Sequence, residues 1–128
     1  MNSAAAYVRS PLRDQSVDAE TQEQEIQEWC SDQDISDITV FKDIDTTANL
    51  GELAGFTTLL EKYHSYDILI VYKLSVFGDD PLVLYRDVGD IVDSNTRIVC
   101  IKELFDTASP MGNLQLQRAL EKRIQFLR

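Results

Sequence analysis

A short stretch near the start of the chain contains residue types that nucleophilic chemistry needs. Tyr7 and Arg9 close an apolar run, and Ser10 follows directly. A serine hydroxyl is a weak nucleophile at neutral pH unless a base activates it or fixed cations stabilise the charge that develops. The candidate catalytic residues are therefore Ser10 as the nucleophile and Arg9 as its cationic partner.

Both residues also have a purely structural interpretation. Ser10 precedes Pro11, and serine often caps turns of this kind. Arg9 stands at the end of a predicted strand, where an ion pair with a neighbouring carboxylate is as reasonable as phosphate binding. His64 is the single histidine, and its place after a helical pattern favours the surface over a catalytic triad.

Metal and cofactor chemistry finds little support. Asp43 and Asp45 offer carboxylates to a divalent cation, but two acids in a polar loop are usually only solvated. Cys30 and Cys100 have no close-spaced partner for a metal site or a redox pair. No glycine-rich phosphate loop follows any predicted strand. We expect neither a metal nor a cofactor.

Composition restricts the class of protein. The chain has 128 residues, of which 44% are hydrophobic, which fits one domain spanning residues 1–128. No apolar run has the length needed to cross a bilayer and no secretion signal opens the chain, so we expect a cytoplasmic protein without a membrane partner. The net charge of −10 repels nucleic acid unless basic groups are gathered locally.

Strand and helix patterns alternate along the chain. Strands are predicted at 4–9, 38–41, 67–72 and 97–101, and helices at 16–34, 55–63, 80–94 and 112–128. Crossovers of this length favour parallel pairing. The sequence therefore predicts an α/β fold, a three-layer sandwich with a mainly parallel sheet of at least four strands, ending in a long helix. Sites in such folds lie at the carboxyl edge of the sheet.

Several of these segments contain characteristic residues in a recognisable order. The first strand and loop keep Tyr7, Arg9, Gln15 and Ser16; the next helix keeps Glu20, Gln22, Ile26 and Trp29; the third strand reads DILIVYKL; and "FDTASPMGNL" contains Asp106, Thr107, Pro110, Met111 and Gly112. In this order they resemble the catalytic domain of serine recombinases, the resolvase and invertase family. The resemblance covers almost the whole chain, and its last motif is the most specific.

The resemblance implies a flavodoxin-like fold and a serine that attacks a DNA phosphodiester to form a phosphoserine link. Aligned without a gap, Pro11 occupies the nucleophile position, and Ser10 regains it only if a residue is deleted before it and one is inserted before Gln15. The family surrounds its serine with arginines that hold the phosphate.

Most of those arginines are missing. Where the family has arginines in the loop after its third strand, this chain has Val76 and Asp79, and Leu53-Ala54-Gly55 replaces an arginine-proline-glycine at the start of the next helix. Asp43 is kept, and Arg9 alone remains of the cationic set. Arg13, Arg86 and Lys73 lie outside the positions that the family uses.

The sequence therefore predicts a catalytically degenerate recombinase-type domain that acts as an oligomerising or regulatory module. The helix Gly112–Arg128 is the expected surface for a homo-oligomer, and DNA or an active recombinase subunit is the other expected partner. We expect no separate DNA-binding domain in this chain. Two alternatives stay open: an active or truncated recombinase that uses Ser10, and an unrelated flavodoxin-like binding module.

Overall fold

The structure is a computed structural model that describes part of the chain in detail. It describes residues 3–10, 18–44, 54–73, 76, 90–91, 94, 96–102, 105–111, 114 and 118. Its elements are β1 (Ser3–Arg9), α1 (Ala19–Asp32), β2 (Asp37–Asp43), α2 (Ala54–Lys62), the 3₁₀ helix η2 (Tyr63–Ser65), β3 (Ile68–Val71), β4 (Arg97–Cys100) and β5 (Phe105–Asp106).

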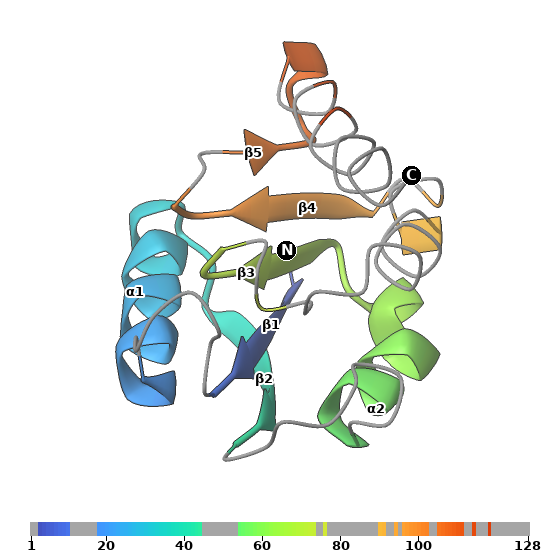
Figure 1. Ribbon diagram of the computed structural model, residues 1–128. Coiled ribbons are helices and arrows are strands. Elements are labelled where there is room, and N and C mark those ends of the chain that lie inside the picture. Colours follow the sequence, from blue (N-terminus) through green and yellow to red (C-terminus); the bar gives the residue numbers. More distant parts are fainter. Residues whose placement is uncertain are drawn as a thin grey trace.

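The strands form one five-stranded sheet in the order β2-β1-β3-β4-β5 (Figure 1). The first four strands pair in parallel, and β5 pairs with β4 in the antiparallel sense. One register row runs through Phe41, Tyr7, Val71 and Cys100. The carboxyl ends of the four parallel strands therefore meet at one edge of the sheet.

Helices cover both faces of the sheet, with α1 on one side and α2 on the other (Figure 1). On the α2 side the core includes Tyr7, Phe56 and Leu59, and on the α1 side it includes Ile26 and Cys30. The apolar strand β1 supplies alternate residues to both clusters, so it is buried on both faces. This is the three-layer α/β sandwich predicted from the sequence.

The ends of α1 follow from local hydrogen bonding. Asp18 caps the start, where its Oδ1 accepts from the Thr21 amide at 2.7 Å. After the helix Asp34 takes the left-handed conformation with φ 58°, which aspartate tolerates better than most residues. The Ile35 amide then donates to the Cys30 carbonyl at 2.8 Å and closes the last turn.

Several element boundaries differ from the sequence prediction. Helix α1 begins at Ala19 rather than Ser16, because Asp18 is its cap, and β2 extends to Asp43. The short strand β5 was not predicted, since two residues carry no recognisable alternation. The predicted helices at 80–94 and 112–128 lie mostly outside the described residues, although positions 90–91, 110–111, 114 and 118 are helical.

Candidate functional site

The two candidate catalytic residues, which are neighbours in the sequence, lie at the carboxyl edge of the sheet. β1 ends at Arg9, whose register partner is Asp43 at the end of β2. Ser10 follows in a bend, is half-buried, and donates its amide to the Asp43 carbonyl at 3.0 Å. Arg9 and Ser10 therefore lie at the edge where α/β proteins place their sites.

Gln22 fixes the backbone of Arg9. Its Nε2 donates to the Arg9 carbonyl at 2.8 Å, and its Oε1 accepts from the Arg9 amide at 3.4 Å. Gln22 is fully buried on α1, and Arg9 is buried as well. Because one side chain meets both polar backbone groups of Arg9, helix α1 sets the direction in which the chain leaves β1 towards Ser10.

The carboxylate of Asp43 caps the N-terminus of α2. Its Oδ1 accepts from the Gly55 amide at 2.8 Å, and its Oδ2 accepts from the Phe56 amide at 2.9 Å and from the Tyr7 hydroxyl at 2.8 Å. The first amides of a helix lack partners within it, and the helix dipole favours an anion there. Burial, and then the hydrogen bond to Asp43, raise the pKa of Tyr7, which keeps its hydroxyl protonated as a donor.

This cap uses an aspartate that the sequence offered as a possible cation ligand. The three donors around Asp43 are neutral, so the carboxylate is stabilised without a metal ion. Asp45 lies outside the described residues. Among the residues that are described, no group of three or more histidine, cysteine, aspartate or glutamate side chains is placed to hold a metal.

Gly55 allows the close approach between α2 and β2. A Cβ atom at this position would lie 2.6 Å from the Lys42 carbonyl oxygen and 2.8 Å from Oδ2 of Asp43. Contacts this short force the backbone or the carboxylate to move. The glycine is therefore required by the same contact that makes Asp43 a cap.

Val76 occupies the first position in the loop after β3 where the resemblance leads one to expect an arginine. It is fully buried in the apolar cluster that also contains Tyr7, Phe56 and Val71. Its amide donates to the Lys73 carbonyl at 3.1 Å. This position therefore serves the core.

A basic side chain lies at the end of β4. The Lys102 amide donates to the Tyr72 carbonyl at 2.9 Å, and its Nζ lies 5.1 Å from the centre of the Tyr72 ring. The Nζ also lies 3.5 Å from Oε2 of Glu25 on α1, and both side chains are partly exposed. Hydrogen bonding to Tyr72 and the nearby charge of Glu25 raise the pKa of Lys102.

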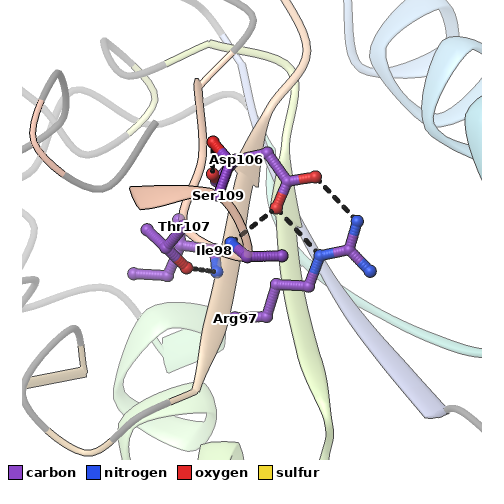
Figure 2. A network of polar contacts seen from close by, with 6 residues as sticks. Arg97, Ile98, Asp106, Thr107 and Ser109 are labelled. Atoms are coloured by element: carbon purple, nitrogen blue, oxygen red, sulfur yellow. Dashed lines mark hydrogen bonds and ion pairs between the residues drawn. The ribbon is translucent and has the colours of Figure 1, made fainter. Parts of the chain in front are cut away.

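Asp106 organises the segment between β4 and the last helix (Figure 2). Its Oδ1 accepts from Nε of Arg97 at 2.9 Å and from the Ala108 amide at 2.9 Å, and its Oδ2 accepts from Nη2 of Arg97 at 2.7 Å. Thr107 adds a second link, because its Oγ1 accepts from the Ile98 amide at 2.8 Å. The Arg97 guanidinium also lies 5.6 Å from the Trp29 ring.

Comparison with known proteins identifies this architecture. The family model "Resolvase, N terminal domain" matches residues 4–120. The chain belongs to the resolvase family. Asp106 and Thr107 of its most specific motif thus have a structural explanation, since they tie the start of the last helix to β4.

Solved structures share this fold. The N-terminal catalytic domain of TP901-1 integrase is similar with a TM-score of 0.82 and 19% identity, over 98% of this chain and 96% of that chain. A resolvase family site-specific recombinase from Streptococcus pneumoniae has a TM-score of 0.73 and 14% identity, over 100% of this chain and 91% of that chain. No curated protein matches the chain.

The site contains residues that sequence reasoning placed and others that it missed. Arg9 and Ser10 were predicted at this edge, and they lie there. Gln22 was noted only as a family match, and its hydrogen bonds to Arg9 depend on how α1 packs. Lys102 was not considered, although its position two residues after an apolar strand was a usable signal.

Other basic residues considered from the sequence lie outside the described residues. These are Arg13 and Arg86. Pro11, Leu53 and Asp79 also lie outside the described residues, as do the basic residues Lys122, Arg123 and Arg128 of the predicted last helix. Arg118 is described and is exposed. No helix of the described part of the chain is long and apolar enough to cross a membrane.

Proposed function

We propose that this resolvase-family domain does not cleave DNA and acts as an oligomerising or regulatory partner in DNA recombination. The observation that carries the proposal is the burial of Val76 in the core, at a position where the family resemblance calls for an arginine. An apolar side chain enclosed by other apolar side chains cannot contact a phosphate. The chain would act in the cytoplasm, where DNA is accessible.

The chemistry explains why this loss matters. Attack of a serine on a phosphodiester needs preorganised donors that stabilise the charge on phosphorus-bound oxygens. Removing one such donor lowers the rate by about 10²–10³. The sequence lacks three of the expected arginines, so the combined loss approaches about 10⁶ even when non-additivity is allowed for.

The start of the last helix supports the second part of the proposal. Met111 and Leu114 are both exposed, and they are spaced so that they share one helical face with Arg118. Exposed apolar side chains on an otherwise strongly acidic protein favour a protein partner. We propose that the partner is a second copy of the chain or an active recombinase subunit.

The first test measures cleavage. The full chain is incubated with supercoiled DNA, denatured, and analysed for covalent protein–DNA adducts, with an active serine recombinase on its own DNA site as the positive control. We expect no adduct. An adduct that disappears in Ser10→Ala would overturn the proposal and establish the alternative, an active or truncated recombinase that uses Ser10 as nucleophile.

One observation favours that alternative. Arg9 and Ser10 lie at the carboxyl edge of the sheet. The third interpretation, an unrelated flavodoxin-like module, is removed by the family match.

The second test measures association. The molar mass of the full chain is determined by light scattering over a range of concentrations, for the unmodified protein and for Leu114→Glu. We expect an oligomer that dissociates in the variant, while Thr57→Glu, an exposed change on α2, leaves it intact. A monomer at all concentrations that also fails to bind an active recombinase subunit would contradict the oligomerising role.

A further inference from the structure

Arg97 joins helix α1 to the segment that precedes the last helix. It is the first residue of β4 and stands two positions before Val99, whose register partner on β5 is Asp106. Val99 belongs to the apolar cluster on the α1 side of the sheet. Because side chains alternate along a strand, Arg97 lies on this same face. Its guanidinium therefore contacts both Asp106 on β5 and Trp29 on α1.

The contact between Arg97 and Asp106 has a defined geometry (Figure 2). Nε and Nη2 of Arg97 donate to different oxygens of the carboxylate, at 2.9 and 2.7 Å. Two parallel hydrogen bonds between a planar guanidinium and a carboxylate restrict the orientation of both groups. Trp29 packs against the apolar cluster on the α1 side, so the ring beside the guanidinium is itself held by the core.

Asp106 transmits this orientation to the start of the last helix. Its Oδ1 also accepts from the Ala108 amide at 2.9 Å, and its carbonyl accepts from the Ser109 amide at 3.1 Å. Helical residues begin at position 110, directly after this turn. The turn is therefore closed on Asp106, and holding its carboxylate in place restricts the direction in which the helix leaves the sheet.

The start of the last helix has an exposed apolar face formed by Met111 and Leu114, which are 64% and 42% exposed. We propose that Arg97 is a positioning residue that holds this face in the direction in which a second copy of the chain binds it. The proposal rests on the proposed function, which assigns self-association to that face. A surface that is oriented before binding loses less conformational entropy on association. Loss of Arg97 should therefore weaken self-association although the binding face is unchanged.

The segment stays attached to the sheet when Arg97 is substituted. The Thr107 amide donates to the Ile98 carbonyl at 3.0 Å, and Oγ1 of Thr107 accepts from the Ile98 amide at 2.8 Å. Neither hydrogen bond involves Arg97. A variant of Arg97 should therefore remain folded and lose the orientation of the helix start rather than the attachment of β5 to β4.

The first experiment measures the dissociation constant of the full chain by analytical ultracentrifugation. We expect Arg97→Gln to weaken self-association about tenfold, an effect of the size typical for coupling between separate sites. The matched control is Lys62→Gln, which removes the same charge from an exposed position at the end of α2 and should leave the constant unchanged. An unchanged constant in Arg97→Gln, or an equal loss in Lys62→Gln, would overturn the proposal.

A double-mutant cycle separates positioning from a general loss of stability. Arg97→Gln, Asp106→Asn and the double variant are compared in self-association and in urea denaturation. If the pair acts as one unit, the double variant associates no more weakly than Arg97→Gln. Asp18→Ala removes the cap of α1, so it lowers stability at a site away from the pair and should associate normally. An equal weakening in Asp18→Ala would mean that stability governs association, and the proposal would be wrong.

Amide hydrogen exchange provides a readout that does not depend on association. In dilute, monomeric protein the amides of Ala108 and Ser109 should exchange faster in Arg97→Gln than in the unmodified chain. Faster exchange together with unchanged association would mean that Arg97 orders the turn without positioning the binding face, which would overturn the proposal alone. An unmodified chain that is monomeric at every concentration would instead contradict self-association, and with it this part of the proposed function.

Discussion

Asp43 and Asp106 differ in their burial and in the charge of their hydrogen-bond donors. Asp43 is buried, and its three donors are two backbone amides and the Tyr7 hydroxyl, all of them neutral. Asp106 is partly exposed and pairs with the guanidinium of Arg97 through two hydrogen bonds. Both aspartates fasten the start of a helical segment to a strand of the sheet.

The two sites differ in whether water can satisfy the hydrogen-bond donors after the aspartate has been substituted. Water reaches the surroundings of Asp106 and can solvate Arg97, so the loss is partly compensated. Around Asp43 the donors lie in the core, where an unsatisfied polar group costs about 1–3 kcal/mol. The two aspartates thus make unequal contributions to stability.

The largest effect is expected from Asp43→Ala. The variant leaves the Tyr7 hydroxyl and the first amides of α2 without their acceptor, so we expect the free energy of unfolding to fall by about 3–5 kcal/mol. Urea denaturation measures the change. The control is Asp37→Ala, an exposed aspartate at the other end of the same strand, which should cost little. Equal losses in both variants would show that the cap does not matter.

Gly55→Ala tests the same contact from the helix side. In an exposed helix the change would stabilise by up to about 1 kcal/mol, because alanine has the higher helix propensity. Here the added Cβ would overlap Lys42 and Asp43, so we expect a loss of about 2–3 kcal/mol. Urea denaturation again provides the measurement, with Thr57→Ala as an exposed control on α2. A gain in stability would refute the close approach.

Asp106→Asn should cost less, about 1–2 kcal/mol at neutral pH, because the ion pair is partly exposed. Hydrogen bonding to Arg97 lowers the pKa of Asp106 below its ordinary value of 3.8. A carboxyl whose pKa is lowered by folding contributes stability above its unfolded pKa and loses it as the pH falls through the folded value. The difference between the two proteins should therefore shrink below about pH 4.

Urea denaturation from pH 7 to pH 2 checks that expectation. A difference that stays constant over this range would mean that the charge of Asp106 does not contribute. At higher salt concentration the unfolding free energy of the unmodified protein should still depend on pH. The size of this dependence should be smaller, since salt screens partly exposed ion pairs.

The fold could be predicted because alternating strands and helices leave few topologies. The apolar runs of β1 and β3 predicted strands, and almost every residue of both strands is buried. The strand β5 could not be predicted, because its two residues are defined by pairing with β4 rather than by any local pattern. The start of α1 is set by the Asp18 cap, and the sequence prediction began this helix three residues too early, at Ser16.

The sequence could predict only those features of the candidate site that depend on neighbouring residues in the chain. Arg9 ends a predicted strand and Ser10 follows it, so their place at the carboxyl edge was predictable. The hydrogen bonds of Gln22 to Arg9, in contrast, depend on the packing of α1 against β1. The contact between Lys102 and Glu25 likewise depends on how α1 packs against the sheet. The role of Asp43 was missed for a related reason, because a capping carboxylate and a solvated one have the same local sequence.

The smallest effect is expected from Tyr7→Phe, which decides how the cap at Asp43 is shared among its donors. The variant removes the hydroxyl but keeps the ring, whose centre lies 5.5 Å from that of Phe56. Because the Phe56 amide still donates to the same carboxylate oxygen, we expect a loss of about 1 kcal/mol in urea denaturation. A loss as large as that of Asp43→Ala would show that the hydroxyl, and not the helix amides, carries the contribution of Asp43, and the contrast with Asp106 would then be one of burial alone.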